Sequence, residues 1–431
     1  MAVEEIAITP IAGPLDATVT PPGSKSITNR ALLLAAMAAG GSTIEGALFS
    51  DDTRQMVTAL AQLGFQITAE EARGRIAIVG RGGTIPAAGA NLSVGGAGTA
   101  MRFLAAFATL GHGRFRIDGN DRMRERPMGE LLDTLTHLGA HAFSEHGNRC
   151  PPVIIERGPE PFAGGEAAID ASASSQFVSA LLMPAPLWRD GLRLRVSGET
   201  ARPFIDMTLR LMERRGARSS VTGDTLIVPG GQSYRAGSFA VEPDASAASY
   251  FAAAAALVGG TVRIRGLDPG SVQGDLAFMR VLEKMGAEVR FDQGAIAVSG
   301  RGRLSGVDVA MNTMPDMVPT LAALAPFASS PTRIRAVGFI RHHESDRLRA
   351  LATELTRIGA SVREFDDGLG IEPAAAPHPA TIETYDDHRI AMAFAVAGLR
   401  LAGLRIRNPG CVAKTYPNFF EDLARLSRPI V

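Results

Sequence analysis

Seven cationic side chains stand beside polar or glycine-rich segments spread along the sequence. Arginine grips phosphate and carboxylate groups through paired hydrogen bonds, and lysine meets them as a point charge. A single arginine of this kind is more often part of a surface ion pair than a ligand. Seven of them in separate segments favour the binding of a molecule with several negative charges. The seven are Lys25, Arg30, Arg102, Arg126, Arg347, Arg389 and Lys414.

Groups that could transfer protons occur among these cations. Asp316 stands in MPDM, His343 and Glu344 stand in RHHESDR, and Asp387 and His388 stand in DDHR. Each has a structural alternative, because an aspartate can cap a helix and a histidine can pack in a core. Several of them together beside arginines favour proton transfer on an anionic substrate.

Six long apolar stretches follow these segments, and they must position the side chains. A helix that is apolar all round is buried on every side. If such helices run roughly parallel, their N-termini gather on one face, where free N–H groups and positive dipole ends favour anions. The segments that precede the six stretches are PGSKSITNR, VGGAGTAMR, DASASSQ, EPDASAAS, NTMPDM and TYDDHR.

An amphipathic pattern with a glycine at its end recurs between the apolar stretches. Apolar residues at helical spacing followed by glycine predict a helix and its C-terminal cap. Six units of two helices and several strands divide most simply into two globular halves of three units each, although a solenoid is the alternative. The recurring glycines are Gly64, Gly139, Gly216, Gly286 and Gly359.

Composition excludes several classes of protein. The 431 residues contain 44 Lys and Arg against 44 Asp and Glu, so overall charge does not favour a nucleic acid or a membrane surface. Two distant cysteines, Cys150 and Cys411, fit a reducing cytoplasm and form no metal-ligand spacing. The first residues, MAVEEIAITP, carry no secretory pattern, and SYFAAAAALVGG is too short to cross a bilayer. No nucleotide-binding, serine-hydrolase or zinc-protease motif occurs in the sequence.

Seven ordered segments resemble the signature segments of the 5-enolpyruvylshikimate-3-phosphate synthase family. They are PGSKSITNR, GGAGTAMRF, RMRERPMG, SASSQF, ESDRLRALATEL, DDHRIAMA and KTYPNF, and they cover essentially the whole chain. The resemblance implies an α/β fold of two similar domains, each with three βαβαββ-type repeats, around a cleft. It implies domains at residues 24–241 and at residues 1–23 plus 242–431.

The resemblance also implies a reaction. The enolpyruvyl group of phosphoenolpyruvate moves to the 5-hydroxyl of shikimate 3-phosphate by addition and elimination, and phosphate is released. This chemistry needs a base, an acid and fixed cations, and it needs no metal or cofactor. The implied protein is a cytoplasmic monomer that binds two small molecules and neither nucleic acid nor membrane.

Site residues follow from the matching segments. Asp316 and Glu344 match the base and the acid, with Lys25 as a third catalytic candidate. The residues that match shikimate 3-phosphate contacts are Lys25, Ser26, Arg30, Ser174, Ser175, Gln176, Asp316 and His343. The residues that match phosphoenolpyruvate contacts are Lys25, Gly98, Arg126, Gln176, Arg347, Arg389 and Lys414.

This sequence departs from the family pattern at a few positions. Gly96 replaces a common asparagine, His343 replaces a common lysine, and Phe339 stands where asparagine is frequent. Ala201 and Phe204 replace a common serine and tyrosine, with Thr200 as a nearby hydroxyl. These departures affect the surroundings and the affinities more than the reaction, since the seven cations, Asp316 and Glu344 are all present.

Two alternatives remain open at this point. The sister enolpyruvyl transferase that acts on UDP-N-acetylglucosamine usually has a reactive loop cysteine, and neither Cys150 nor Cys411 stands in a comparable segment. A non-catalytic relative that binds phosphate metabolites would also fit the cations, and the His343 and Gly96 departures favour it. An RNA 3′-phosphate cyclase shares related repeats, but the nucleotide and nucleic-acid signals expected of it are absent from the sequence.

Overall fold

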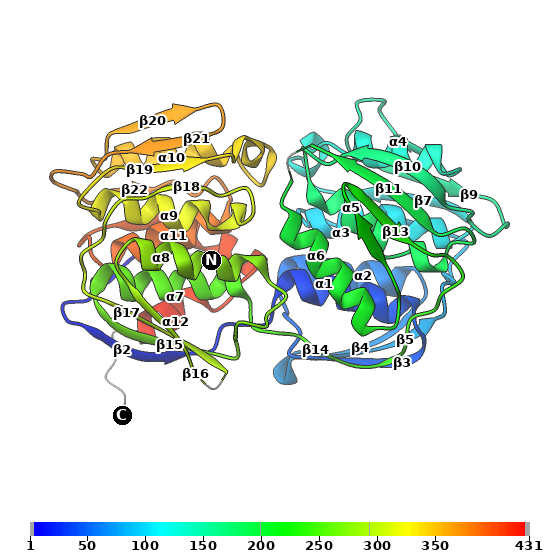
Figure 1. The fold of residues 1–431 in the computed structure, drawn as a ribbon, viewed down its shortest axis with the longest axis horizontal. Helices are drawn as coiled ribbons and strands as arrows, with labels where there is room; N and C mark the ends of the chain where they lie inside the picture. The colour runs from blue at the N-terminus through cyan, green and yellow to red at the C-terminus, as the bar shows by residue number, and fades with distance from the viewer. Residues whose placement is uncertain (1–3, 199, 293, 427–431) are drawn as a thin grey trace. The chain divides into compact units, whose positions relative to one another are not determined.

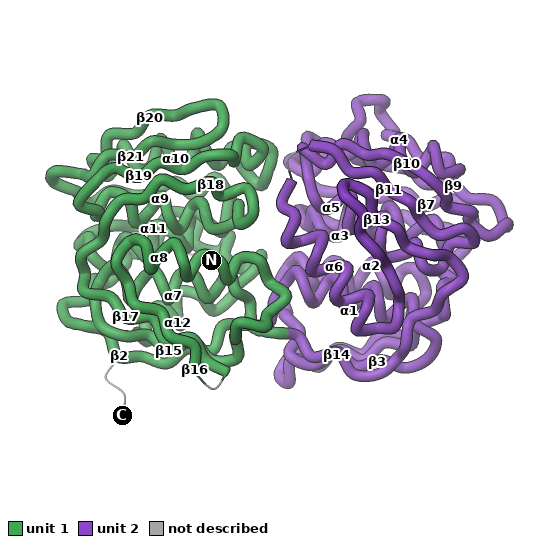
Figure 2. Tube along the Cα trace, in the orientation of Figure 1, with its two compact units in different colours: residues 1–22, 242–431 green, residues 23–241 purple. Residues whose placement is uncertain are grey.

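A computed structural model of the protein describes residues 4–198, 200–292 and 294–426. The chain divides into two compact units, coloured separately in Figure 2. Unit 2 runs from Gly23 to Val241, and unit 1 combines the chain up to Pro22 with the chain from Glu242 onward. The division therefore falls one residue earlier than the boundary expected after residue 23.

Unit 2 contains three four-stranded sheets with the same internal order. In each sheet the first two strands are parallel and the remaining pairs are antiparallel. The sheets, in strand order, are β14 (Gly237–Ala240), β3 (Ala39–Glu45), β5 (Arg75–Arg81) and β4 (Gln66–Glu70); β6 (Gly89–Ser93), β7 (Gly113–Asp118), β9 (Val153–Arg157) and β8 (His141–Ser144); and β10 (Gly165–Asp170), β11 (Leu192–Ser197), β13 (Thr225–Val228) and β12 (Ser220–Thr222).

Unit 1 repeats this arrangement in two sheets and closes with a shorter third one. The four-stranded sheets are β2 (Leu15–Val19), β15 (Gly260–Arg265), β17 (Ala295–Gly300) and β16 (Glu288–Asp292), and β18 (Asp308–Ala310), β19 (Thr332–Arg335), β21 (Gly368–Ile371) and β20 (Val362–Phe365). The third sheet has the order β1 (Glu5–Ala7), β23 (Arg405–Arg407) and β22 (Thr381–Ile382).

Two strands explain why unit 1 is discontinuous. The N-terminal β2 pairs in parallel with β15, which follows it by more than two hundred residues. The first repeat of unit 2 instead takes its outer strand, β14, from the end of that unit, and β14 pairs with β3. In each unit, the first sheet therefore takes its outer strand from a distant part of the sequence: β2 in unit 1 and β14 in unit 2.

Six buried helices form the centre of the repeats, three in each unit (Figure 1). Every residue of α3 and of α11 is buried, as expected for helices that are apolar all round. The predicted α/β class is thus confirmed. The six are α1 (Lys25–Met37), α3 (Gly98–Phe107), α5 (Ser175–Leu182), α7 (Ala245–Val258), α9 (Val318–Leu324) and α11 (His388–Gly398).

Amphipathic helices alternate with the buried ones and bury one face only. The five recurring glycines each follow such a helix with φ between 90° and 105°, the left-handed region in which a side chain is strained. The glycines that recur in the sequence therefore mark the C-terminal ends of these helices. The helices are α2 (Asp51–Gln62), α4 (Gly129–His137), α6 (Arg202–Arg214), α8 (Phe278–Lys284), α10 (Arg347–Arg357) and, last, α12 (Phe419–Arg425).

Side-chain caps at the buried helices fix where the candidate residues stand. The Ser24 hydroxyl accepts a hydrogen bond from the first turn of α1, and Ser174 does the same for α5. Asp387 caps α11 by accepting from the Arg389 backbone N–H at 3.0 Å. A capping residue and a candidate site residue are therefore neighbours in the same segment. Helix capping and a role in a site are compatible in these segments.

Candidate active site

The first turn of α1 in unit 2 presents Lys25. Its Nζ atom lies 3.1 Å from Asp52 Oδ2, which comes from the first turn of α2. Both side chains are largely buried, at 12% and 4% exposure. The contact with Asp52 holds the largely buried Lys25 side chain at the start of a helix. A fixed cation at a helix N-terminus is suited to binding an anion.

Arg30 lies one turn further along α1 and is enclosed by neutral groups. Its guanidinium donates to Thr208 Oγ1 at 2.8 Å, to Ser179 Oγ at 3.3 Å and to the backbone oxygens of Ser26 and Phe204. In the described part of the chain no carboxylate forms an ion pair with it. Burial lowers the pKa of Arg30 to about 9, so the group is still charged at neutral pH.

Gly98, the first residue of α3, lies directly against two guanidinium groups. A Cβ atom at this position would come within 2.7 Å of Arg126 Nη1 and 3.0 Å of Arg102 Nη1. Arg102 Nη1 also donates to the Gly98 backbone oxygen at 3.2 Å. A side chain at this position would displace the Arg126 guanidinium from the start of α3.

Arg126 itself is 7% exposed, and its Nε atom has no hydrogen-bond partner among the described residues. A buried polar group without a partner is costly unless a ligand or water satisfies it. Arg126 and the start of α3 together therefore make a second location in unit 2 that favours an anion.

The start of α5 supplies neutral hydrogen-bonding groups. Ser174 accepts from the Gln176 backbone N–H at 3.1 Å, and Ser175 is buried in the first turn. The Gln176 Oε1 atom is buried and finds no donor within residues 4–198, 200–292 and 294–426. These groups can hold hydroxyl or phosphate oxygens without adding charge.

Unit 1 presents a different arrangement, built around Arg347 at the start of α10. Its guanidinium contacts Asp387 at 2.8 Å, Glu344 at 2.8 Å and Asp316 at 3.0 Å. Burial alone lowers the pKa of Arg347, but these carboxylates raise it more, so the net pKa lies above the ordinary value. Arg347 is therefore permanently charged and holds three acids together.

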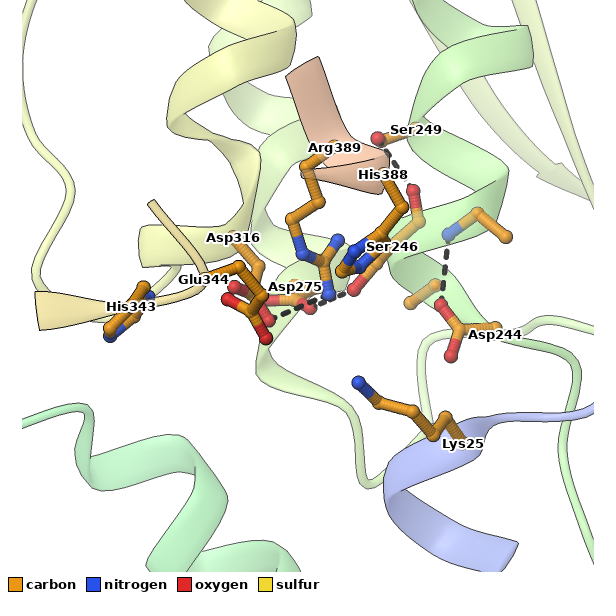
Figure 3. A network of polar contacts seen from close by, with 12 residues as sticks. Lys25, Asp244, Ser246, Ser249, Asp275, Asp316, His343, Glu344, His388 and Arg389 are labelled. Carbon is orange, nitrogen blue, oxygen red and sulfur yellow. Dashed lines mark hydrogen bonds and ion pairs between the residues drawn. The ribbon is translucent and has the colours of Figure 1, made fainter. Parts of the chain in front are cut away.

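Asp316 connects the two arginines of this unit. It lies in a short 3-10 helix, η6 (Pro315–Met317), and its Oδ2 accepts from Arg389 Nη2 at 2.8 Å, a contact drawn in Figure 3. Burial raises the pKa of Asp316, but Arg389 and Arg347 outweigh burial, so the net pKa is below the usual value. Asp316 is thus ionised at neutral pH and can accept a proton.

His343 and Glu344 precede α10 and lie on either side of the Arg347 guanidinium. The His343 Nδ1 atom is 3.1 Å from Arg347 Nη1. An arginine can only donate, so Nδ1 of His343 is the acceptor in this contact. Lys414 ends the 3-10 helix η9 (Pro409–Lys414) in the same unit.

Asp275 is a buried carboxyl group that the sequence analysis missed. It accepts a hydrogen bond from Ser246 Oγ, and its Oδ1 has no partner in the described residues. Figure 3 shows it close to Arg389 and Asp316. Burial raises the pKa of Asp275 to about 7, and the nearby charge of Asp316 adds to the effect. Its QGD segment has no repeat cue, so only packing identifies it.

The structure brings five of the sequence-predicted residues into contact in unit 1. Asp316, His343, Glu344, Arg347 and Arg389 form one contact network in unit 1. The candidates in unit 2 lie at the starts of α1, α3 and α5, apart from Arg126, which touches Gly98. Asp387, noted in the sequence only as an acid-base candidate, is the residue that anchors Arg347.

Metal and membrane features were also sought in the described residues. There, no group of three or more His, Cys, Asp or Glu side chains could hold a metal ion. Within the same residues, no helix is long and apolar enough to pass through a bilayer.

Known proteins resemble this chain over nearly its full length. The sequence pattern of the EPSP synthase (3-phosphoshikimate 1-carboxyvinyltransferase) family matches residues 10–423. A 3-phosphoshikimate 1-carboxyvinyltransferase of Trichormus variabilis is 47% identical over 98% of this chain and 99% of its own length. The corresponding protein of Salmonella schwarzengrund is 45% identical over 99% of this chain and 100% of its own.

Solved structures agree with the sequence comparison. An EPSP synthase structure from Acinetobacter baumannii covers 99% of this chain and 98% of its own, with a TM-score of 0.81 and 26% identity. The fold and the sequence thus define the same class of protein, an enolpyruvyl transferase. The chain belongs to the EPSP synthase (3-phosphoshikimate 1-carboxyvinyltransferase) family, which confirms the resemblance of the seven segments.

Proposed function

We propose that this protein transfers the enolpyruvyl group of phosphoenolpyruvate to the 5-hydroxyl of shikimate 3-phosphate and releases phosphate. The family match over residues 10–423 carries the proposal. The relatives named 3-phosphoshikimate 1-carboxyvinyltransferase support the reaction, and every predicted site residue is present in this chain. The proposal also places the protein in the cytoplasm as a monomer.

The two units contribute different chemistry under this proposal. Unit 2 supplies the main contacts to shikimate 3-phosphate through Lys25, Ser26, Arg30 and the Ser174–Gln176 segment, and Gly98 with Arg126 for phosphoenolpyruvate. Unit 1 supplies the acid-base groups and the remaining cations. The unpaired charge of Arg30 and the unsatisfied Nε of Arg126 support the assignment to anions.

The addition step needs a base and an acid. The 5-hydroxyl oxygen bonds to C2 of phosphoenolpyruvate while Asp316 takes the hydroxyl proton and Glu344 gives a proton to the methylene carbon. In the elimination step Glu344 takes a proton back from the resulting methyl group, the bond from C2 to the phosphate oxygen breaks, and Asp316 returns its proton to the departing phosphate. The proton count is balanced, and no cofactor takes part.

Substrate binding makes Asp316 a stronger base under this mechanism. In the free chain Arg347 and Arg389 hold its pKa down through direct contacts. The same two arginines are the proposed partners of phosphoenolpyruvate. When the anionic substrate shares their charge, their stabilisation of the Asp316 carboxylate weakens, and its affinity for a proton rises.

The cysteines argue against the sister reaction on UDP-N-acetylglucosamine. Burial raises the pKa of Cys411 to about 12, and burial also raises the pKa of Cys150. Neither thiol is therefore activated as a thiolate near neutral pH.

One experiment tests the proposal and its rivals together. The full chain is incubated with phosphoenolpyruvate and either shikimate 3-phosphate or UDP-N-acetylglucosamine, and released phosphate and enolpyruvyl product are quantified. We expect equal amounts of both with shikimate 3-phosphate only. Product from UDP-N-acetylglucosamine would indicate the sister enzyme. Binding of both proposed substrates without product, in a folded preparation, would indicate a non-catalytic relative.

A further inference from the structure

Helix α10 carries two buried charged residues on one face. Arg347 and Glu354 are seven residues apart, which is about two helical turns, so they point the same way. The Glu354 side chain is 0% exposed although it is a carboxylate. Buried carboxylates persist only when their oxygens receive hydrogen bonds or cations, so the partners of Glu354 show what it does.

Glu354 holds the segment that leads into α11. Its Oε2 accepts from the Glu383 backbone N–H at 3.1 Å, and its Oε1 accepts from the Tyr385 hydroxyl at 2.8 Å. Arg357 approaches Oε2 at 3.3 Å and balances the charge. Burial, with Glu354 as the next cause, raises the pKa of Tyr385 to about 12, so the hydroxyl keeps the proton that it donates.

The held segment is a tight turn in a strained conformation. Tyr385 and Asp386 both have positive φ, at 54° and 56°, and neither is a glycine. Such values are unfavourable for residues with a side chain and persist only when contacts impose them. The Asp387 N–H closes the turn by donating to the Thr384 backbone oxygen at 2.8 Å.

Asp387 follows the turn directly and contacts both Arg347 and the backbone of Arg389. Asp387 is 0% exposed, receives Arg347 Nε at 2.8 Å and Ser345 Oγ at 3.0 Å, and accepts from the Arg389 backbone N–H. Helix α10 thus holds the turn at two points: Arg347 binds its end and Glu354 binds its beginning. Displacement of the turn would move Asp387 and both arginines.

We propose that Glu354 and Tyr385 are positioning residues that form a latch, which sets Arg347 and Arg389 for binding the anionic group of phosphoenolpyruvate. This inference rests on the proposed function, because it uses the assignment of those two arginines. The latch residues are not among the proposed substrate contacts. They act through the turn at 383–387 and through Asp387.

Tyr385→Phe tests the latch with the smallest change, since it removes one hydroxyl and leaves the ring. Tyr234→Phe is the matched control: its hydroxyl donates to the Met183 backbone oxygen at 2.7 Å in the other unit. We expect Tyr385→Phe to raise KM for phosphoenolpyruvate about threefold to tenfold, with kcat and KM for shikimate 3-phosphate unchanged. The control should leave all three values unchanged.

Glu354→Gln provides the second variant, because glutamine keeps the shape but not both acceptor oxygens. The same KM shift is expected, combined with faster backbone hydrogen exchange in residues 383–391 for both latch variants. The exchange measurement needs no turnover, so failure of the proposed function is recognised separately, as absent phosphate release by the unchanged chain. An unchanged KM for phosphoenolpyruvate in Tyr385→Phe, or an equal shift in Tyr234→Phe, would overturn the latch.

Discussion

Arg30 and Arg347 are both buried, and both lie in the first two turns of a helix, yet the charges around them differ. Arg30 is surrounded by hydroxyls and backbone oxygens, and burial lowers its pKa to about 9. Arg347 contacts three carboxylates, which raise its pKa above the ordinary value against the effect of burial. One guanidinium therefore carries an uncompensated positive charge, and the other is already compensated by acids.

This difference explains how similar repeats in the two units can serve different steps. An uncompensated buried cation gains most from an incoming anion, so Arg30 is suited to binding. A compensated one keeps Asp316 ionised as a base and fixes Glu344 beside it, so Arg347 is suited to positioning both carboxyl groups for proton transfer.

Asp316→Asn is expected to have the largest effect. Loss of the proton acceptor should lower kcat by about a thousandfold, the range seen for general bases. Asparagine keeps the size of the side chain, so the fold should be retained. The measurement is phosphate release at saturating concentrations of both substrates, with a thermal unfolding curve as the control for folding. A kcat within about threefold of the unchanged chain would remove Asp316 from the role of base.

Replacement of the two arginines by methionine compares the units directly. Arg347→Met leaves the buried Asp387 without its cation and removes one cationic partner of Asp316 and of Glu344, so it should lower the free energy of unfolding by about 3–5 kcal/mol. Arg30→Met leaves only neutral acceptors unsatisfied and should cost about 1–3 kcal/mol. Both values come from denaturant titrations of the full chain. Equal losses, or a larger loss for Arg30→Met, would contradict the electrostatic contrast.

Arg126→Ala should mainly weaken phosphoenolpyruvate. Removal of a guanidinium that is buried beside Gly98 should raise KM for this substrate by about thirtyfold, as for a charge-assisted hydrogen bond. Arg124→Ala is the control, because Arg124 is half-exposed and pairs with Asp118 at 2.9 Å. A loss confined to shikimate 3-phosphate would show that Arg126 has been assigned to the wrong substrate.

Asp275→Asn should leave catalysis least affected, and its effect should be visible as a change in the pH dependence of stability. With a raised pKa the folded chain keeps a proton that the unfolded chain has lost, so stability falls as pH rises from about 4 to about 7. The asparagine variant lacks this proton. Over that range the free energy of unfolding of the variant, relative to that of the unchanged chain, should rise by about 1 kcal/mol per pH unit. Parallel unfolding free energies at pH 4.5, 5.5 and 6.5 would exclude the raised pKa.

Much of the fold could be predicted from the sequence, because its signals are local. Glycines such as Gly286 end five of the amphipathic helices and recur with the buried helices, and each signal needs only neighbouring residues. The exchange of β2 and β14 could not be derived from the residues. A five-residue strand such as Leu15–Val19 does not indicate its partner, so the discontinuous domain came from the family resemblance alone.

The site shows the same limit at the level of single residues. Residue types and segments indicated Arg30, Arg347 and Asp316 as candidates. Their surroundings depend on contacts between distant positions: Thr208, a partner of Arg30, is 178 residues away, and Asp387 is 40 residues from Arg347. Asp275 has no motif of its own, since burial alone makes its carboxyl group unusual.

The central claim, that Asp316 transfers a proton rather than binds substrate, is tested most directly by calorimetric titration of Asp316→Asn. Each substrate is titrated alone into the variant and into the unchanged chain, so that no turnover occurs during the titration. The variant lacks one negative charge beside Arg347 and Arg389, so anion binding has no electrostatic reason to weaken. We predict that both Kd values stay within about threefold of those of the unchanged chain, because neither binding event involves proton transfer. Loss of both affinities by about a hundredfold or more would show that Asp316 holds the substrates, and it would contradict the account.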